Sequence, residues 1–378
     1  MAEQCKILFL SAPIGSGHVR AAQAVGAAVR TLSPTAEISF ANVFDFFSPV
    51  LGRTILRSYL RLLDLYPRAY GMMYGWGNTS RFAVAGRELI SRFLADRMFQ
   101  YIQLHSPTAI VCTHATPAGL VAHLCKTARI TIPVFAVVTD FVVHRLWVYP
   151  EIDTYFVADD AMRTYLDDQG ISLAKSRTTG IPVDEKFTLP SDRAKTLTTL
   201  GLSPDRKTLL IMGGGAGVLP MADIITVCEE LAIPLQIIAV AGHNRALLHQ
   251  LDSRAKTLKW CTLRPLGFVN NVHDLMAVSN LLISKPGGMT AAEALCRGLP
   301  LLIFRPIPGQ EEANTRYLID HAAGESVHSP QELQTQLTKL LIEQPDTLSV
   351  LHQRATALGR PTAAQEIAQA VLAAVSAR

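Results

Sequence analysis

Short apolar runs alternate with longer stretches of helical periodicity along most of the chain. The runs have the length and composition of strands buried in the middle of a sheet. Buried strands that alternate with helices are typical of parallel sheets covered on both faces, so we predict an α/β protein. The predicted strands lie at residues 7–10, 38–43, 109–112, 134–139 and 154–157, and in a second series at residues 208–212, 235–240, 281–284 and 301–304.

The two series of strands predict two domains. Between them, residues 188–207 are polar and rich in Thr, Ser, Asp and Pro, which is typical of a linker. We therefore expect an N-terminal domain at residues 1–187 and a C-terminal domain at residues 208–360. Each is predicted to be a Rossmann-like, doubly wound parallel sheet, and the two are expected to face a cleft. Residues 361–378 predict an amphipathic helix that can pack on either half, including back on the N-terminal domain.

The clearest candidate for a binding site follows the predicted strand at residues 281–284. Residues 284–290 read Ser-Lys-Pro-Gly-Gly-Met-Thr and lead into an Ala-rich helical pattern. A strand, a glycine turn and a helix start bring backbone N–H groups and a helix dipole to one point, which suits a phosphate. Glu293, one turn further on, can reach a ribose hydroxyl beside that phosphate. The arrangement predicts a ligand that carries a nucleotide.

Two more loops follow predicted strands of the same half. Residues 213–215 are three successive glycines, which permit positive φ angles and close approach of the backbone to a ligand. Residues 308–314 read Pro-Gly-Gln-Glu-Glu-Ala-Asn and gather carboxylates and amides, the types that bind sugar hydroxyls. Because the carboxyl ends of parallel strands meet at one edge of a sheet, we expect these loops and residues 285–290 to form one site.

The N-terminal half also begins with a strand and a glycine-rich turn, and the notable residue there is His18. Residues 15–20 read Gly-Ser-Gly-His-Val-Arg, which completes neither a dinucleotide fingerprint nor a P-loop. His18 is expected at a helix N-terminus, whose dipole lowers the histidine pKa and favours the neutral form that accepts a proton. A purely structural histidine is the alternative, but the exposed, glycine-rich setting favours a role in catalysis or in acceptor binding.

Composition indicates a folded protein of about two domains. The chain has 378 residues, of which 49% are apolar and 17% charged, and no run approaches the roughly 18–20 apolar residues that cross a bilayer. The N-terminus lacks the layout of a signal peptide. The six cysteines are scattered without Cys-x-x-Cys spacing, so we expect reduced core residues of a cytoplasmic protein and no zinc site or disulfide framework.

The net charge of +4 is unevenly distributed. Residues 51–100 contain eight arginines and three acidic residues, so this window alone carries +5. Arg53, Arg57 and Arg61 recur at helical spacing beside an apolar face, and an aromatic, Met-rich segment follows at residues 66–76. Such a stretch favours contact with an anionic membrane surface. A core helix with solvated arginines is the other interpretation, and the lack of a lysine-rich patch or known binding motif disfavours nucleic acid.

Six motifs, in order along the chain, resemble those of a known family. They are Gly15-Ser16-Gly17-His18-x-x-Ala21-Ala22, Thr139-Asp140-Phe141-x-x-His144-x-x-Trp147, Thr179-Gly180-Ile181-Pro182-Val183, Met212-Gly213-Gly214-Gly215, Lys285-Pro286-Gly287-Gly288-x-Thr290-x-x-Glu293 and Pro308-Gly309-Gln310-Glu311-x-x-Asn314. Together they resemble the monogalactosyldiacylglycerol synthase and processive diacylglycerol glucosyltransferase family. A more distant resemblance is to the cell-wall enzyme that adds N-acetylglucosamine to a lipid-linked muramyl peptide.

The resemblance implies an inverting GT-B glycosyltransferase, similar to glycosyltransferase family 28. It implies transfer of a hexose from UDP-glucose or UDP-galactose to a diacylglycerol-type lipid at the membrane surface, which yields a glycolipid. His18 is then the base or the group that positions the acceptor, with Asp140 or His144 as its helper. The implied donor site consists of Gly213, Gly214, Gly215, Phe268, Val269, Lys285, Gly287, Gly288, Thr290, Glu293, Gln310, Glu311 and Asn314. The implied acceptor or membrane-facing set consists of Gly17, Arg53, Arg57, Arg61, Tyr74, Trp76, His144 and Trp147.

The resemblance also implies a role for each part of that donor site. The glycines lie against the pyrophosphate, and Phe268 and Val269 contact the uracil. Glu293 holds the ribose, and the polar side chains of residues 310–314 hold the hexose. Backbone N–H groups, a helix dipole and Lys285 meet the charge on the leaving UDP.

No metal ion or other cofactor is expected, because no two aspartates are separated by one residue and the metal-binding Asp-x-Asp of other transferases is missing. The expected partners are a UDP-hexose, a diacylglycerol or glycolipid acceptor and an anionic membrane, without nucleic acid. We expect a cytoplasmic protein that is peripheral on the inner face of the cell membrane. The alternatives are a transferase like the muramyl peptide enzyme, a UDP-sugar epimerase on the same scaffold, and a non-catalytic nucleotide-sugar or lipid-binding protein.

Overall fold

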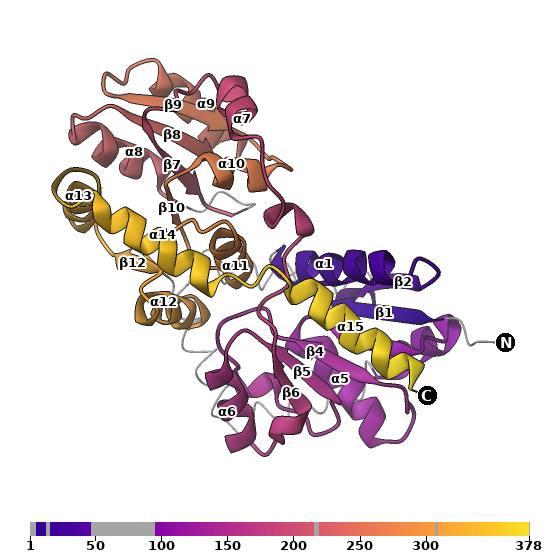
Figure 1. Ribbon diagram of the computed structural model, residues 1–378. Helices are drawn as coiled ribbons and strands as arrows, with labels where there is room; N and C mark the ends of the chain where they lie inside the picture. The colour runs from indigo at the N-terminus through magenta and orange to yellow at the C-terminus, as the bar shows by residue number, and fades with distance from the viewer. Residues whose placement is uncertain (1–4, 13–15, 47–94, 215–218, 307–308, 378) are drawn as a thin grey trace. The chain divides into compact units, whose positions relative to one another are not determined.

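The structure is a computed structural model that describes residues 5–12, 16–46, 95–214, 219–306 and 309–377. These residues belong to two compact units, drawn in Figure 1. The N-terminal unit comprises Met1–Asp184, Ile307–Gln310 and Arg360–Arg378, and the C-terminal unit comprises Glu185–Pro306 and Glu311–Gly359. Each contains a six-stranded sheet, and every pairing between the described strands is parallel. The predicted fold class is confirmed.

The sheet of the N-terminal unit has the strand order β2-β1-β3-β4-β5-β6. The chain runs from β1 to β2 on one side and then crosses to β3 on the other, so the winding reverses between β1 and β3. Ligands of open α/β sheets bind beyond the carboxyl ends of the strands at such a switch point. The strands are β1 (Lys6–Ser11), β2 (Glu37–Asn42), β3 (Ala109–Cys112), β4 (Val134–Val137), β5 (Thr154–Val157) and β6 (Ser176–Thr178).

The C-terminal helix α15 (Ala363–Ser376) belongs to the N-terminal unit, where it lies against α1 (Gly17–Leu32). Small side chains such as Ala24 of α1 and Ala368 of α15 share a buried cluster with Phe9 of β1. Their size permits the two helices to approach closely. Other helices of this unit include α5 (Ala115–Lys126), α6 (Asp160–Asp168) and the short 3₁₀ helices η1 (Val43–Phe46), η2 (Arg145–Trp147) and η3 (Leu173–Lys175), and residues 95–105 are helical as well.

The sheet of the C-terminal unit has the order β12-β11-β10-β7-β8-β9, so its winding reverses between β7 and β10. This is the strand order of the dinucleotide-binding Rossmann fold. The strands are β7 (Lys207–Met212), β8 (Leu235–Val240), β9 (Cys261–Leu266), β10 (Leu281–Ser284), β11 (Leu301–Phe304) and β12 (Gly324–Val327). The helices are α7 (Arg193–Leu200), α8 (Met221–Glu230), α9 (Arg245–Ala255), α10 (Val272–Val278), α11 (Gly288–Cys296), α12 (Gln310–Asp320), α13 (Pro330–Thr338) and α14 (Asp346–Leu358), with the 3₁₀ helix η4 (Glu185–Phe187) and the π-helical turn η5 (Lys339–Glu343).

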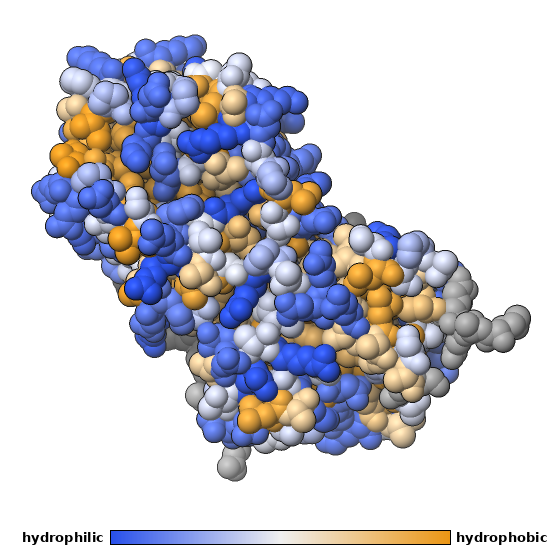
Figure 2. Space-filling view, viewed as in Figure 1, coloured by the Kyte–Doolittle hydropathy of each residue, from blue (hydrophilic) through white to orange (hydrophobic). Residues whose placement is uncertain are grey.

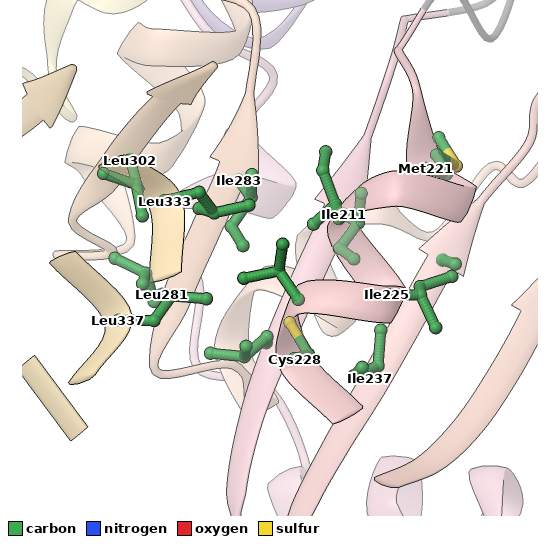
Figure 3. Close-up of a cluster of buried hydrophobic side chains, with 14 of the residues drawn as sticks. Ile211, Met221, Ile225, Cys228, Ile237, Leu281, Ile283, Leu302, Leu333 and Leu337 are labelled. Atoms are coloured by element: carbon green, nitrogen blue, oxygen red, sulfur yellow. The ribbon is translucent and has the colours of Figure 1, made fainter. Parts of the chain in front are cut away.

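One face of the C-terminal sheet is covered by α8 and α13. Figure 3 shows Ile211 of β7 and Ile283 of β10 among side chains of these helices, including Ile225 of α8 and Leu333 of α13. In the view of Figure 2, hydrophilic residues cover much of the surface, and hydrophobic residues form patches between them. Strands β3, β4, β8, β10 and β11 are buried along their whole length beneath such a surface. The cores are therefore built from the apolar runs that predicted the sheets.

Three strands were missed by the sequence pattern. They are β6, β9 and β12, and each lies at the edge of its sheet. An edge strand needs only one paired neighbour and is partly exposed, so it keeps polar residues such as Arg177 of β6 or Glu325 of β12. β9 contains Pro265, which has no backbone N–H to donate. Proline is tolerated in an edge strand, because the N–H on its open side needs no partner strand.

Residues 188–207, predicted to be a linker, contain the helix α7. Asp192 caps its N-terminus, and Gly201 ends it with a φ of 62°. Leu197 is buried, and the helix contacts α10. The division between the units falls at Asp184, so this segment belongs to the C-terminal unit. The short, polar helix resembled a linker because only one of its side chains enters the core.

Candidate active site

The carboxyl ends of β1, β3 and β4 bring several histidines and one carboxylate together in the N-terminal unit. His18 lies in the first turn of α1, which follows β1. Thr113 and His114 follow β3, and Thr139 and Asp140 follow β4. Because β1 and β3 are the strands between which the winding reverses, this cluster occupies the switch point of the N-terminal sheet.

His18 is held by two oxygens on one side of its ring. Its Nδ1 lies 3.0 Å from the carbonyl oxygen of Thr113 and 2.7 Å from the hydroxyl oxygen of Thr139. A carbonyl oxygen only accepts, so the network assigns the ring proton to Nδ1. In the neutral ring Nε2 then carries the lone pair. The geometry therefore prepares His18 to accept a proton at Nε2.

The pKa of His18 is lowered below its usual value of 6.5, chiefly by burial. The carboxylate of Asp140 and the hydrogen bond to the Thr113 carbonyl act in the opposite direction. The sequence predicted this direction but attributed it to the helix dipole, whereas the largest cause is desolvation. His18 is consequently neutral near pH 7 and lies beside a carboxylate that favours its protonated form.

Two more imidazoles lie in the same cluster. The ring of His114 meets that of His18 edge to face, with 4.6 Å between centroids and an interplanar angle of 89°. Burial, with the neighbouring His18 and His144, holds the pKa of His114 well below 6.5, and burial beside His18 lowers the pKa of His144 to about 4. Sequence reasoning missed His114, because its role depends on ring contacts with residues that are distant in sequence.

Asp140 is buried, and one of its carboxylate oxygens accepts a hydrogen bond from Nε2 of Gln310, which belongs to the same unit. The prediction that Gln310 binds the hexose stays a prediction.

Trp147 corrects an expectation: its side chain is only 2% exposed, so it belongs to the core and not to a membrane-facing surface. Its carbonyl accepts a hydrogen bond from the buried Tyr155 hydroxyl (2.9 Å), which anchors η2 inside the unit.

In the C-terminal unit, the loops after β7 and β10 meet at the switch point of the sheet. Ser284, the last residue of β10, donates from Oγ to the carbonyl of Met212, the last residue of β7, at 2.8 Å. Gly213 follows directly, and Gly214 has a φ of 71°, the left-handed region that favours glycine. Gly214 is exposed, and no described atom lies within 4 Å of a Cβ built on it. The backbone is therefore open to a ligand here.

Helix α11 begins at this switch point without a side-chain cap. Its N-cap is Gly287, which has no side chain and so makes no side-chain capping bond to the N–H groups of the first turn. Gly287 is exposed, and a Cβ built on it meets no described atom within 4 Å. Lys285 and Thr290 flank the turn and are partly exposed. Uncapped N–H groups, an open backbone and a nearby lysine make this a site for an anion such as a diphosphate.

Two polar side chains predicted to bind the donor are buried around this loop. Asn314 of α12 is 1% exposed, and its Nδ2 donates to the carbonyl of Pro286 at 3.0 Å, so it holds the loop in place. Glu293 of α11 is also 1% exposed. Glu311, in the first turn of α12, is half-buried. That these residues contact ribose or hexose stays a prediction.

Phe268 follows β9 and forms an exposed aromatic stack. Its side chain is 56% exposed, and its ring stacks on His243, which follows β8, with centroids 4.3 Å apart and an interplanar angle of 10°. Val269 is half-buried beside it in sequence. A flat ring that is already stacked on one face suits a nucleobase. His243 was not identified from the sequence, because a lone histidine after a strand carries no distinctive signal.

Gly17, predicted to contact the acceptor, is the first residue of α1. Several other predicted site residues lie outside the residues that the structure describes. No cluster of His, Cys, Asp or Glu that could hold a metal ion occurs in the described ranges. Of the helices that the structure describes, none has the length and apolar character to cross a membrane. The predicted residues outside the description are Arg53, Arg57, Arg61, Tyr74, Trp76 and Gly215.

Two family models match the chain. One is described as monogalactosyldiacylglycerol (MGDG) synthase and matches residues 18–183. The other is described as glycosyltransferase family 28 C-terminal domain and matches residues 208–369. The first contains the histidine cluster, and the second contains the loops after β7 and β10.

Two similar proteins from bacilli are both named processive diacylglycerol beta-glucosyltransferase. The protein from Bacillus pumilus is 31% identical over 339 residues, which are 89% of this chain and 86% of the relative. The protein from Bacillus mycoides is 29% identical over 378 residues, which are 99% of this chain and 95% of the relative.

Solved structures with the same fold include MurG from Acinetobacter baumannii, with a TM-score of 0.63 and 14% identity over 98% of this chain and 99% of that one. Another is UDP-GlcNAc 2-epimerase from Neisseria meningitidis bound to UDP-GlcNAc, with a TM-score of 0.61 and 16% identity over 97% of this chain and 100% of that one. At these identities the likeness concerns the fold alone.

Proposed function

This chain belongs to the monogalactosyldiacylglycerol synthase and processive diacylglycerol glucosyltransferase family, and we propose that it transfers a hexose from a UDP-sugar to the hydroxyl of a diacylglycerol-type lipid. The products are a glycolipid and UDP. The observation that carries the proposal is the uncapped N-terminus of α11 beside the glycine turn after β7. Both lie at the switch point of the C-terminal sheet, where the fold binds nucleotides.

The C-terminal unit supplies the groups that a UDP-sugar requires. The N–H groups of α11 and the exposed backbone of Gly214 and Gly287 suit the diphosphate. The exposed ring of Phe268 suits the uracil face. Glu293 is assigned to the ribose hydroxyls and Glu311 to the hexose, because carboxylates accept the hydrogen bonds that sugar hydroxyls donate. Gln310, which belongs to the N-terminal unit, is assigned to the hexose as well.

The N-terminal unit supplies the base. In the proposed reaction the acceptor oxygen attacks the anomeric carbon and its proton passes to Nε2 of His18. The bond between the anomeric carbon and the β-phosphate oxygen breaks, and UDP leaves with the electron pair. A single displacement of this kind inverts the anomeric configuration. Asp140 stabilises the imidazolium of His18 electrostatically, because its carboxylate favours the protonated ring.

The negative charge that develops on UDP is met by N–H groups of α11 and by Lys285. Preorganised backbone dipoles and a lysine stabilise a leaving diphosphate without a metal ion. The absence of an Asp-x-Asp sequence supports a reaction that needs no divalent cation. No other cofactor takes part, since the donor itself carries the activated hexose.

The acceptor is a membrane lipid, so the enzyme acts at a lipid surface. The arginine-rich window at residues 51–100 supports contact with anionic lipid on the inner face of the cell membrane, where UDP-sugars are available. We assign the protein to the cytoplasm as a peripheral membrane enzyme. Nucleic acid has no part in this function.

The names of the relatives favour UDP-glucose as the donor. UDP-galactose is a second candidate, because the model that matches residues 18–183 is described by a galactolipid synthase. The test is incubation of the purified chain with diacylglycerol vesicles and a panel of labelled UDP-sugars, followed by lipid extraction. Label is expected in the lipid fraction with UDP-glucose. Label that stays in the aqueous phase with every donor would refute the proposed function.

A further inference from the structure

His114 adds a hydrogen-bond donor to the cluster around His18, and the two rings lie edge to face. Its Nδ1 accepts a hydrogen bond from the backbone N–H of Thr116 at 3.1 Å, and so caps the N-terminus of α5. Because its pKa lies well below 6.5, the ring is neutral at pH 7. A neutral imidazole whose Nδ1 accepts carries its proton on Nε2. His114 therefore offers an N–H, whereas Nε2 of His18 offers a lone pair.

Capping alone does not account for a histidine at this position. Ser, Thr, Asp and Asn are the strongly preferred N-caps, and each would satisfy the Thr116 N–H with a shorter side chain. Histidine adds the Nε2–H donor, and the ring is only half-buried. Its centroid lies 4.6 Å from that of His18, so a small acceptor group can reach both rings.

The same strand end has a second hydrogen-bonding group that the described protein leaves unused. Thr113 is fully buried, and among the described residues no partner lies within hydrogen-bonding distance of its hydroxyl oxygen. A buried hydroxyl without a partner is costly, so such groups usually mark a site that a ligand or water completes. The Nε2–H of His114 and the hydroxyl of Thr113 are therefore two hydrogen-bonding groups at this strand end that the fold itself does not need.

The acceptor chemistry supplies the matching group. A diacylglycerol has one free hydroxyl, which gives its proton to the base, and two ester carbonyls, which only accept hydrogen bonds. One carbonyl belongs to the ester on the carbon next to the hydroxyl-bearing carbon. A site that takes the proton with one histidine needs a donor nearby to hold this carbonyl.

We propose that His114 is an acceptor-specificity residue that donates a hydrogen bond from Nε2 to an ester carbonyl of the lipid while His18 removes the proton of the neighbouring hydroxyl. His114 transfers no proton in this step. The inference rests on the proposed function, because it concerns the same acceptor site. It predicts that the enzyme distinguishes ester lipids from ether lipids.

The test compares 1,2-diacylglycerol with 1,2-dialkylglycerol, which has the same hydroxyl and no carbonyl. The wild type is expected to prefer the diester by roughly fivefold in kcat/KM, the effect of one neutral hydrogen bond. His114→Asn keeps the cap, since asparagine is a strong N-cap, but has no group at the position of Nε2. Its ester-to-ether ratio is expected to fall to about one, with Tm unchanged. His114→Ala is expected to lose both the preference and some thermal stability.

A wild-type ratio near one, or a His114→Asn enzyme that keeps the wild-type ratio, would overturn the inference. If His114→Asn folds poorly, His114→Asp, which also retains a capping oxygen, is measured in the same way. Failure of the proposed function gives a different result, because the wild type would then transfer label neither to the diacylglycerol nor to the dialkylglycerol.

Discussion

Nδ1 of His18 lies 3.0 Å from the carbonyl oxygen of Thr113, and this contact assigns the proton-accepting role to Nε2. The partner is a backbone group at the end of the neighbouring strand, so the sheet itself orients the ring. Thr139 adds a hydroxyl at 2.7 Å from the same nitrogen. The catalytic tautomer of the proposed base is thus set by the fold before any substrate binds.

The pH dependence of kcat/KM tests the state of His18. The base works only as the neutral imidazole, so activity falls as the pH falls through its pKa. Because burial lowers that pKa, the acid limb is expected below pH 6.5. Asp140→Asn removes the carboxylate that raises the pKa and should move the limb to still lower pH. Asp168→Asn, at an exposed end of α6, serves as the control and should leave the profile in place.

Gly287→Ala tests whether the start of α11 binds a diphosphate. The φ of −64° and ψ of 136° at Gly287 suit alanine, and no described atom opposes the new Cβ, so Tm should not change. The methyl group would stand where a phosphate approaches, and UDP affinity by calorimetry is expected to fall about tenfold or more. The matched control is Gly170→Ala: its φ of 87° predicts a loss of about 1–2 kcal/mol in stability with unchanged UDP affinity. Unchanged affinity in Gly287→Ala would contradict the site.

Glu293→Gln tests the assignment of the ribose. A carboxylate that accepts hydrogen bonds contributes about 1.5–3 kcal/mol, so UDP affinity should fall by roughly tenfold to a hundredfold. The analogue 2′,3′-dideoxy-UDP should bind the wild type weakly and should lose little further affinity in the variant, because the bonded hydroxyls are already missing. Glu312→Gln, exposed in the first turn of α12, is the control. Equal losses for UDP and the analogue would argue that Glu293 acts only through the fold.

Excess chelator should leave turnover intact. Helix N–H groups and Lys285 are proposed to stabilise the leaving diphosphate, so EDTA at concentrations far above any trace metal should not change kcat. The measurement is the initial rate of lipid labelling with and without EDTA. A loss of activity that magnesium restores would contradict a metal-independent reaction.

The buried parts of the fold were predictable from the sequence, and the partly exposed parts were not. Strands such as β8 and β10 are apolar along their length, so their sequence follows directly from burial on both faces. The edge strand β6 is three residues long and polar, and it is recognisable only through its pairing with β5. Helix α7 was mistaken for a linker because its single buried residue, Leu197, gives no periodic signal.

The candidate site was predictable where chemistry follows from a motif, and not where it follows from packing. His18 and the glycines stand in recognisable loops after strands. The orienting carbonyl of Thr113 has no sequence signature, because every residue has a carbonyl. Trp147 was assigned to the acceptor or membrane-facing set through the family resemblance, yet its side chain is buried at η2. His114 was overlooked because its role depends on a ring contact with a residue far away in sequence.

The central claim is that His18 acts as the base when a hexose is transferred from a UDP-sugar to the hydroxyl of a lipid. The most direct measurement compares wild type with His18→Ala in vesicles of diacylglycerol and anionic lipid, supplied with UDP-glucose labelled in the sugar. The account predicts that the wild type moves label into the lipid phase and releases one UDP per hexose. His18→Ala should do so about 10²–10⁴ times more slowly while binding UDP with unchanged affinity. Equal rates of lipid labelling in the two proteins would contradict the account.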